Sequence, residues 1–393
     1  MKKNLHLTHT DIETDSRILK EMGGLASEGY SVGGIGVELE EGAKKTAVPF
    51  AADIKAIRLQ ARSLKFLPRT LRHALTLCEL LFRMLPRAVS RKPDIVHCHD
   101  TLVLPLGFLV KLLTGAQLVY DAHELESDRN GLTPVQGWLT LRAEKFLWRF
   151  IDALIVPSPS ALTWYHDNIG PKPSSVIMNS PLFESGLGQQ GDYLRKKFDI
   201  PDDRRIFIYV GIIGPGRGID LILDVFTHPE SHSHVVFMGF GEFEPKVAQL
   251  AMVHGNIHLH PAVPHAQVVH ISQSADFGLC LIENVSLSDY YCLPNKLFEY
   301  IFAGVPVLSS DFPDLSAVVD EYNVGRTSSL EPDQVRKAIS ELESSPQSFE
   351  FRDLTPLSWQ AQEAKLLDLY QHILSTRQSK EADGAAEPQA GRP

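Results

Sequence analysis

The sequence is poor in cysteine, and the spacing of its cysteines matches no common disulfide or metal-binding motif. The four of them among 393 residues, at positions 78, 98, 280 and 292, form no Cys-x-x-Cys motif, and three lie in apolar runs. This pattern excludes a disulfide framework and a zinc site built from cysteine pairs. Reduced thiols predict a cytoplasmic setting.

Long apolar runs are missing as well. The longest, Leu102 to Val110, contains Pro105 and ends at Lys111, whereas a membrane-spanning helix needs about 18 or more apolar residues. The start of the chain, residues 1–9, is typical of a short strand and not of a signal peptide. We therefore expect a cytoplasmic protein without a membrane span.

Positive charge is scarce except in one segment. Lys and Arg number 38 against 48 Asp and Glu, a net charge of −10, so we expect no nucleic acid partner. Residues 55–92 reverse this balance with ten basic residues and one acid, interleaved with leucine and phenylalanine. Such a segment is typical of a basic amphipathic helix on an anionic membrane, or of an ordinary helix pair with one wet basic face.

Short apolar runs alternate with helix-period segments along most of the chain. Strands are predicted at 4–8, 30–36, 94–97, 117–121, 153–156, 175–178, 206–210, 234–238, 257–260, 277–281 and 305–308. This alternation predicts two doubly wound α/β domains with parallel sheets, whose ligands bind at the carboxyl ends of the strands. This alternation stops in a segment that we predict to be a linker. The end of the chain consists of small and polar residues, which predicts disorder. The resulting division is 1–180, linker 181–205, 206–357, a helix at 358–375 and a disordered tail at 376–393.

The stretch from Leu293 to Pro306 follows a predicted strand and carries two charged residues on one helix face. Pro294 suits the start of a helix, whose free amides favour an anion, and Lys296 adds a positive charge. Glu299 lies three residues further on, on the same face. A cation beside a carboxylate suits the diphosphate and ribose of a nucleotide, and an exposed Lys–Glu pair is the simpler interpretation.

This stretch resembles the donor-binding signature of the retaining glycosyltransferases of family 4, in a Pro-Asn-Lys-x-x-Glu-Tyr variant. The resemblance covers nearly the whole chain and implies the GT-B fold, with two Rossmann-like domains facing a central cleft. It implies an N-terminal acceptor-binding domain, a C-terminal nucleotide-sugar-binding domain and a last helix that returns to the first. Glu299 would hold the ribose, and the main chain of Cys292 and Leu293 would meet the diphosphate and sugar. Tyr291 stands at the cleft where many members carry a Glu that contacts the sugar.

Two glycine-rich turns follow strands of the second half. Glycine lets the backbone approach a phosphate closely, and the resemblance implies that Gly211, Gly239 and Gly241 line the donor. Arg217 matches a basic position that neutralises the diphosphate in the family, whereas Ile212 replaces a second basic residue. Each turn is otherwise typical of a plain strand-to-helix connection.

The candidate site residues of the first half are histidines and one arginine. His97 and His99 share a strand face, but the sequence offers no third ligand nearby, so we expect no metal site. The resemblance implies that His123 faces the reacting sugar carbon; a loop histidine bonded to backbone is the alternative. Arg17 follows the predicted N-cap Asp15. We place Arg17 and His99 at the cleft, where Arg17 faces donor phosphates or an anionic acceptor, or else solvent.

These features predict transfer of a sugar from a nucleotide-diphosphate sugar to an acceptor hydroxyl, with retention of configuration. Arg217, Lys296 and helix-start amides would stabilise the departing diphosphate, with His123 at the sugar and with no metal or other cofactor. Family analogy suggests a glycan or lipid-linked acceptor of the cell envelope, and a cytoplasmic protein that is free or peripheral on the inner membrane face. The alternatives are a catalytically silent GT-B protein that binds nucleotide sugars or membranes, and a sugar-nucleotide epimerase of the same fold.

Overall fold

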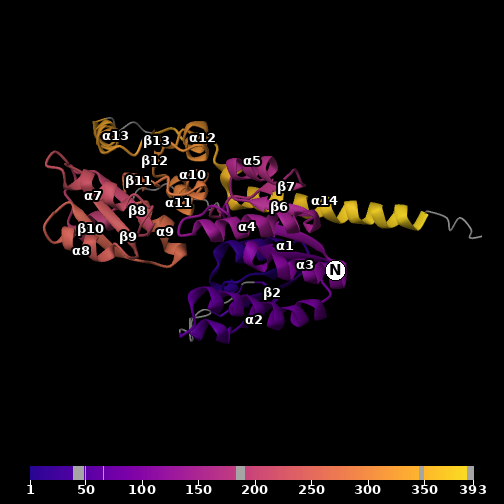
Figure 1. Ribbon diagram of the computed structural model, residues 1–393. Coiled ribbons are helices and arrows are strands. Elements are labelled where there is room, and N and C mark those ends of the chain that lie inside the picture. The colour runs from indigo at the N-terminus through magenta and orange to yellow at the C-terminus, as the bar shows by residue number, and fades with distance from the viewer. Residues whose placement is uncertain (39–47, 49, 65, 183–190, 345–348, 387–393) are drawn as a thin grey trace, which may run out of the picture.

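The computed structural model describes residues 1–38, 48, 50–64, 66–182, 191–344 and 349–386. Within them the chain forms two α/β halves, each built on a parallel sheet (Figure 1). Residues 183–190 of the predicted linker and 387–393 of the predicted tail lie outside the described residues.

The first sheet has seven parallel strands among the described residues, in the order β3-β2-β1-β4-β5-β6-β7. They are β1 (Lys3–Leu7), β2 (Ser31–Val37), β3 (Ala52–Ile57), β4 (Ile95–His99), β5 (Gln117–Asp121), β6 (Ala153–Val156) and β7 (Ser174–Val176). Six of these follow the predicted alternation. The sequence did not predict the edge strand β3, because its charged Asp53 and Lys55 break the apolar run.

Helices cover both faces of this sheet. They are α1 (Ser16–Ser27), α2 (Arg69–Ser90), α3 (Leu104–Thr114), α4 (Pro134–Leu147) and α5 (Pro159–Asn168). One apolar core joins the sheet to α2, α3 and α5, through buried side chains such as Leu80, Val110 and Tyr165. A second core joins the opposite face to α1 and to the last helix of the chain.

The second sheet has six parallel strands among the described residues, in the order β10-β9-β8-β11-β12-β13. They are β8 (Ile206–Ile212), β9 (His234–Phe240), β10 (Ile257–Pro261), β11 (Phe277–Cys280), β12 (Val307–Ser310) and β13 (Gly325–Ser328). Runs of branched and aromatic residues form its centre, as expected for strands buried on both faces. The short, polar β13 was not predicted.

The helices of the second half lie on both faces of its sheet. They are α6 (Tyr193–Phe198), α7 (Ile219–Thr227), α8 (Glu244–Ala251), α9 (His265–Ser272), α10 (Leu287–Tyr290), α11 (Asn295–Phe302), α12 (Pro313–Tyr322) and α13 (Pro332–Ser344). One core contains α11 and α12, and the other contains α7, α8 and α13. Helix α6 lies inside the segment predicted as a linker.

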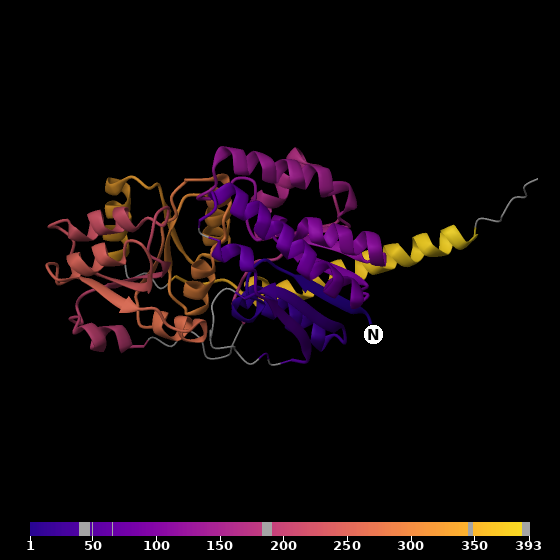
Figure 2. The ribbon, with the colours of Figure 1, turned by 60° about the horizontal axis from the view of Figure 1, so that its bottom comes forward.

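The last helix, α14 (Trp359–Ala386), crosses from the second half to the first and extends beyond it (Figures 1 and 2). Its apolar side chains, among them Leu366, Tyr370 and Ile373, recur at helical spacing and pack beside Ile18 and Met22 of α1. The helix continues through 376–386, where disorder was predicted, because this stretch contains strong helix formers such as alanine, lysine and glutamate. None of the described helices has both the length and the apolar character needed to cross a bilayer.

Candidate active site in the interdomain cleft

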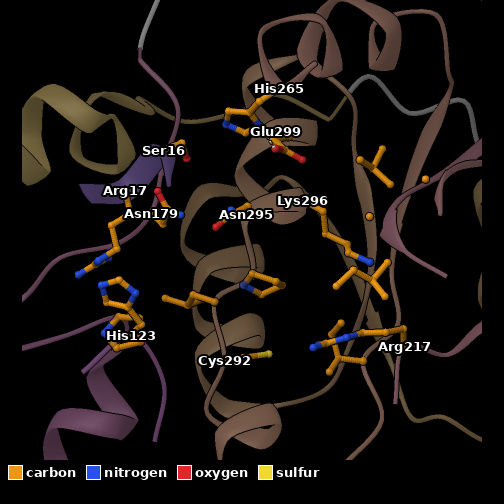
Figure 3. A pocket seen from close by; sticks show the side chains of 18 of the residues that line it. Ser16, Arg17, His123, Asn179, Arg217, His265, Cys292, Asn295, Lys296 and Glu299 are labelled. Atoms are coloured by element: carbon orange, nitrogen blue, oxygen red, sulfur yellow. Dashed lines mark ion pairs between the residues drawn. The ribbon is translucent and has the colours of Figure 1, made fainter. Parts of the chain in front are cut away.

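A cavity of about 680 Å³ lies between the two halves, where the carboxyl ends of strands from both sheets face each other (Figure 3). The first half contributes residues that follow β1, β5 and β7, and the second contributes residues that follow β8, β9, β10 and β11. Residues predicted for the site line it as follows: Arg17, His123, Gly211, Arg217, Gly239, Tyr291, Cys292, Leu293, Lys296 and Glu299. Gly241 and His99 are absent from this lining.

Lys296 is a buried cation that has no counter-ion in the part of the chain that the structure describes. Helix α11 begins after Pro294, and the Lys296 side chain extends from its first turn into the cleft (Figure 3). The residue is 8% exposed, and among the described residues its Nζ has no hydrogen-bond partner. Nζ lies 3.7 Å from the centre of the Tyr209 ring. Because a buried ammonium without a partner is costly, this position calls for an anion.

Glu299 lies one turn further along α11, and its carboxylate is 5% exposed. Its Oε1 lies 3.1 Å from Nδ1 of His265, at the start of α9. Both residues line the cleft. The exposed Lys–Glu pair considered from the sequence is therefore excluded, because both side chains are buried at the cleft. A carboxylate with one imidazole neighbour can still accept hydrogen bonds from a diol.

Arg217 is oriented by Asp289, a residue that sequence reasoning missed. Its NH1 donates to Oδ1 of Asp289 at 3.3 Å, and Oδ2 of Asp289 accepts from the Ser286 hydroxyl at 2.7 Å. The Arg217 side chain remains 30% exposed and points into the cleft (Figure 3). One carboxylate thus fixes the guanidinium and leaves donors on it unused.

The glycines bring β8 and β9 close together at the cleft. Gly211 has φ +120°, and a Cβ at Gly239 would lie 1.8 Å from the carbonyl oxygen of Gly211, so a side chain at Gly239 is excluded. Gly241 supports the same turn from outside the cavity lining. The amide of Gly218, just before α7, donates to the Glu283 carboxylate at 3.1 Å.

Arg17 differs from the prediction, because its guanidinium is already satisfied. It donates to both carboxylate oxygens of Asp121, at 3.1 and 2.8 Å, and to the carbonyl of Ile177 at 2.8 Å. Burial disfavours the Asp121 carboxylate, but Arg17 and His123 outweigh it and hold the pKa of Asp121 well below its usual range. Arg17 therefore does not replace the cation that Ile212 removes; Ile212 is 56% exposed at the cleft.

His123 projects into the first-half side of the cleft, opposite Lys296 and Arg217 (Figure 3). Its Nε2 lies 3.1 Å from Oδ2 of Asp121 and its Nδ1 lies 3.7 Å from Oδ1 of Asp100. Burial lowers the pKa of His123, but these two carboxylates outweigh burial and raise the pKa to about 10. The alternative of a loop histidine held by backbone is not what the structure shows, since both ring nitrogens face carboxylates.

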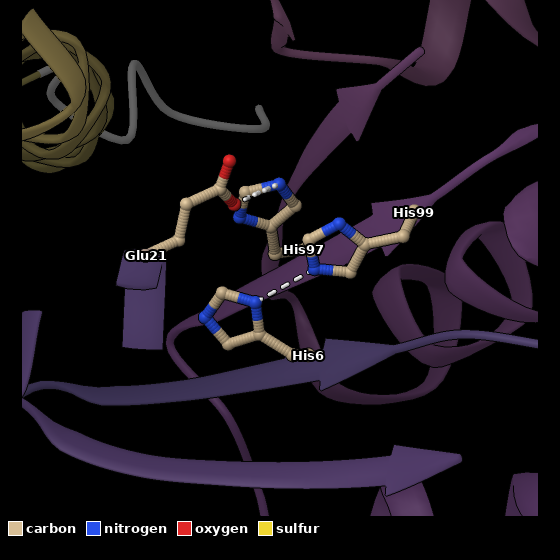
Figure 4. Close-up of side chains that lie close together, drawn as sticks. All are labelled: His6, Glu21, His97 and His99. Atoms are coloured by element: carbon tan, nitrogen blue, oxygen red, sulfur yellow. Dashed lines mark hydrogen bonds and ion pairs between the residues drawn. The ribbon is translucent and has the colours of Figure 1, made fainter. Parts of the chain in front are cut away.

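His99 lies beneath the cleft and not in it, because it is fully buried between the sheet and α1. With His6, His97 and Glu21 it forms a cluster, all of it inaccessible to solvent (Figure 4). His6 Nδ1 lies 2.9 Å from His99 Nε2, and His97 Nδ1 lies 2.7 Å from the Tyr370 hydroxyl. Sequence reasoning missed His6 and Glu21 as neighbours of the His97–His99 pair.

The geometry of this cluster favours hydrogen bonding over metal binding. The three imidazole planes lie within 28°, 17° and 15° of one another. The lone pair of an imidazole nitrogen lies in the plane of its ring. Three rings stacked in nearly parallel planes therefore cannot all direct a lone pair at one ion, as tetrahedral coordination would require. Burial, and next His99, lowers the pKa of His97 to about 3, so this imidazole is neutral.

Tyr291, Cys292 and Leu293 all line the cleft. The Tyr291 carbonyl accepts from the Ser158 hydroxyl at 2.5 Å, which ties this segment to the first half. Burial raises the pKa of the Cys292 thiol, which disfavours the thiolate a nucleophile needs. The amide of Cys292 donates to the carbonyl of Asp289 at 3.4 Å.

Each half of the chain matches a known protein family. Residues 17–181 match the family described as glycosyl transferase 4-like domain, and residues 192–353 match the family described as glycosyl transferases group 1. The chain belongs to the GT-B glycosyltransferases. The predicted fold, two parallel-sheet α/β domains of GT-B type, is confirmed.

Curated relatives of this glycosyltransferase are distant. It is 24% identical over 156 residues to a D-inositol 3-phosphate glycosyltransferase of Streptosporangium roseum, covering 37% of this chain and 36% of the relative. It is 25% identical over 275 residues to the enzyme of that name from Segniliparus rotundus, covering 65% of this chain and 59% of the relative. The chain thus spans less than two thirds of the length of either relative.

Solved structures share the fold of the glycosyltransferase over nearly its whole length. Sucrose-phosphate synthase from Thermosynechococcus elongatus has a TM-score of 0.72 at 15% identity, covering 98% of this chain and all (100%) of that one. Anabaena HepE in complex with UDP-glucose has a TM-score of 0.68 at 14% identity, covering 96% and 100%. At these identities the likeness establishes the fold.

Proposed function

We propose that this glycosyltransferase is a retaining, metal-independent enzyme of family 4 that uses a nucleotide-diphosphate sugar. The buried, unpartnered ammonium of Lys296 carries the proposal, because it lies in the cleft beside Gly211 and needs an anion. The likeness to HepE, whose structure contains UDP-glucose, agrees with such a donor.

In this proposal the donor lies along the second half. The diphosphate binds Lys296, Arg217 and the main chain at the start of α11, and the ribose diol donates to Glu299. The main chain of Cys292 and Leu293 adjoins the diphosphate and sugar. The family resemblance of the Pro-Asn-Lys-x-x-Glu-Tyr stretch supports these assignments.

Transfer breaks the bond between the anomeric carbon and the diphosphate oxygen and forms a bond from that carbon to the acceptor oxygen on the same face. The acceptor proton moves to an oxygen of the leaving diphosphate, which balances the step without a metal ion. Cations that stabilise the departing negative charge lower the barrier, and each donor of this kind typically contributes about 3–4 kcal/mol. Exclusion of water between the two domains would prevent hydrolysis.

We propose a glycan or lipid-linked acceptor, presented at the inner face of the cytoplasmic membrane. The basic segment supports this, because Phe66 and Phe82 are 80% and 82% exposed, and α2 also carries Arg72 and Arg87. A shallow groove on this surface is lined by Leu64, Leu75, Cys78 and Phe82. Exposed apolar side chains among cations suit an anionic lipid surface. Lys65 of this segment lies outside the described residues.

A turnover assay with UDP-, GDP- and ADP-sugars, with and without an acceptor mixture, tests the function. We expect nucleotide release that depends on the acceptor, and a product whose anomeric configuration by NMR matches that of the donor. A donor at 100 times its dissociation constant should also stabilise the fold by about 2.7 kcal/mol in a thermal-shift screen.

Two outcomes would contradict the proposal. Binding of nucleotide sugar without release would indicate the catalytically silent binder, which the replacement of basic and acidic family residues by Ile212 and Tyr291 favours. Turnover of the donor to an isomer in the absence of acceptor would indicate the epimerase.

A further inference from the structure

Asp100 adopts a backbone conformation that is costly for its residue type. It directly follows β4 with φ +70° and ψ 159°, a region where residues other than glycine are rare. Its amide donates to the carbonyl of Asp121 at 2.9 Å, which aligns the ends of β4 and β5. A strained residue at the carboxyl edge of a sheet, beside the cleft, points to a role for its side chain.

That side chain faces two imidazoles at the cleft. The Asp100 carboxylate lies 3.7 Å from Nδ1 of His123 and 3.5 Å from Nδ1 of His9. On the other side of the His123 ring, Oδ2 of Asp121 lies 3.1 Å from Nε2, and Nδ1 of the buried His99 lies 3.0 Å from the same nitrogen. Two carboxylates from neighbouring strand ends therefore bracket one imidazole, whose side chain remains 19% exposed.

Among the charges that act on His123, the two carboxylates favour its cationic form and Arg17 opposes it. Asp100 and Asp121 are anions, and Arg17 of α1 is one cation within the group. Burial, followed by Asp121, raises the pKa of Glu21 well above its usual range, so Glu21 is neutral. Burial likewise raises the pKa of Glu126, next to Asp100, and lowers that of His99. Burial also lowers the pKa of His9, the other imidazole beside Asp100, whereas the two carboxylates raise that of His123.

We infer that Asp100 and Asp121 are positioning residues that hold His123 as an imidazolium at the cleft, so that His123 acts through its charge and not as a base. The inference rests on the glycosyl transfer proposed above. A permanent imidazolium on the first domain faces Lys296 and Arg217 on the second, so cations flank the departing diphosphate from both sides (Figure 3). The acceptor proton then goes to the leaving group, since a protonated imidazole cannot accept it.

The charge of His123 can be measured without any substrate. NMR of the full chain, labelled with ¹³C in its 16 histidines, gives each titration, and the spectrum of His123→Gln identifies the signal of His123. We expect His123 to titrate near pH 10, as the raised pKa of about 10 implies. In Asp100→Asn the pKa should fall by about one to three units, because one of two opposite charges is lost.

A second variant separates the charge from the backbone strain. Asp100→Gly keeps φ +70° without strain and removes the carboxylate, so it should lower the pKa of His123 as Asp100→Asn does. Asp311→Asn is the control, an exposed residue that directly follows β12 of the other domain. It should change neither the titration of His123 nor turnover.

The same variants have a kinetic signature. In the unmodified enzyme kcat/KM should hold from pH 7 to 9 and fall as pH rises through about 10, where the imidazolium loses its proton. In both Asp100 variants this fall should begin at the lower pH at which their His123 titrates, and activity should recover at pH 6. A merely structural role for Asp100 would not give recovery at low pH.

Three outcomes would overturn the inference: His123 titrating near its usual 6.5 in the unmodified protein, a titration unchanged by both Asp100 variants, or a rate that rises as His123 loses its proton. Failure of the proposed function would look different, because the NMR titrations would behave as expected while no nucleotide is released.

Discussion

The two faces of the cleft use charge in opposite ways. On the first domain, Arg17, Asp121, His123 and Asp100 form a buried network in which each charge has an opposite neighbour. On the second domain, Lys296 has no counter-ion among the described residues. On that second face Arg217 and Glu299 do have ionisable neighbours, Asp289 and His265, so the contrast rests on Lys296.

This difference separates positioning from binding. In a paired network the charges satisfy one another when the site is empty, so the first domain holds His123 in one orientation. An unpaired buried cation destabilises the empty site and favours whatever anion enters. Removal of a charge should therefore damage stability on the first face and ligand binding or turnover on the second.

We expect the largest effect from a substitution that breaks the charged network of the first domain. Arg17→Ala leaves Asp121 and Glu21 buried without their partner, so the free energy of unfolding should fall by about 3–5 kcal/mol. Chemical denaturation measures this. Arg336→Ala is the control, because its partners Asp224 and Asp333 are exposed and the loss should stay below about 1 kcal/mol. A stable Arg17→Ala protein with weakened donor binding would reverse our assignment of Arg17.

Next is the unpaired cation of the second domain. Lys296→Ala should lower turnover several hundred-fold, about 3–4 kcal/mol of barrier, with little change in folding stability, since among the described residues Lys296 loses no counter-ion and leaves behind only the Tyr209 ring. Steady-state nucleotide release and thermal unfolding measure the two quantities. Lys246→Ala, in an exposed pair with Asp220 of α7, should leave both unchanged. A large loss of stability in Lys296→Ala would mean that Lys296 is structural.

Glu299→Gln tests whether Glu299 and Lys296 of α11 bind different parts of the donor. Hydrogen bonds to a charged acceptor are worth about 1.5–3 kcal/mol, so affinity for the cognate nucleoside diphosphate should fall tenfold or more. Calorimetry measures it. Binding of inorganic pyrophosphate should not change, because it lacks the ribose, and Glu341→Gln on α13 is a surface control. Equal weakening of both ligands would argue against ribose recognition.

The smallest expected effects lie on the surface of the first domain. Arg72→Ala and Arg87→Ala should each weaken binding to vesicles of equal parts phosphatidylglycerol and phosphatidylcholine by about 1 kcal/mol, roughly fivefold. Vesicle co-sedimentation measures this, with pure phosphatidylcholine vesicles as the control. Equally strong binding to both kinds of vesicle would indicate that the basic surface is an ordinary solvent-exposed helix face.

Local patterns in the sequence predicted the fold class, and they predicted Lys296 and Glu299 of the second domain as neighbours, which the structure places together at the cleft. Runs such as 206–210 predict buried parallel strands, and Lys296 and Glu299 share one short helix. The edge strand β3 and the short β13 carry too little apolar signal to be predicted from periodicity.

The first domain's side of the site was harder, because its partners are far apart in the sequence. Arg17 and Asp121 are 104 residues apart, and nothing local shows that they meet. One signal was present for Asp100 and Asp121: each stands at the carboxyl end of a predicted strand, the edge where parallel sheets bind ligands. Asp289 offered no comparable signal beyond its place in a polar loop.

The packing of α14 has a consequence for how the protein is made. One face of the N-terminal sheet is covered by α1 and by side chains such as Leu366 and Tyr370 of α14, so this face is completed by a helix that follows the whole second domain in the chain. While the second domain is being synthesised, the apolar side chains that α14 covers, and His97 beside Tyr370, remain exposed to water. Truncation of the chain before Trp359 should therefore leave this face of the first domain uncovered.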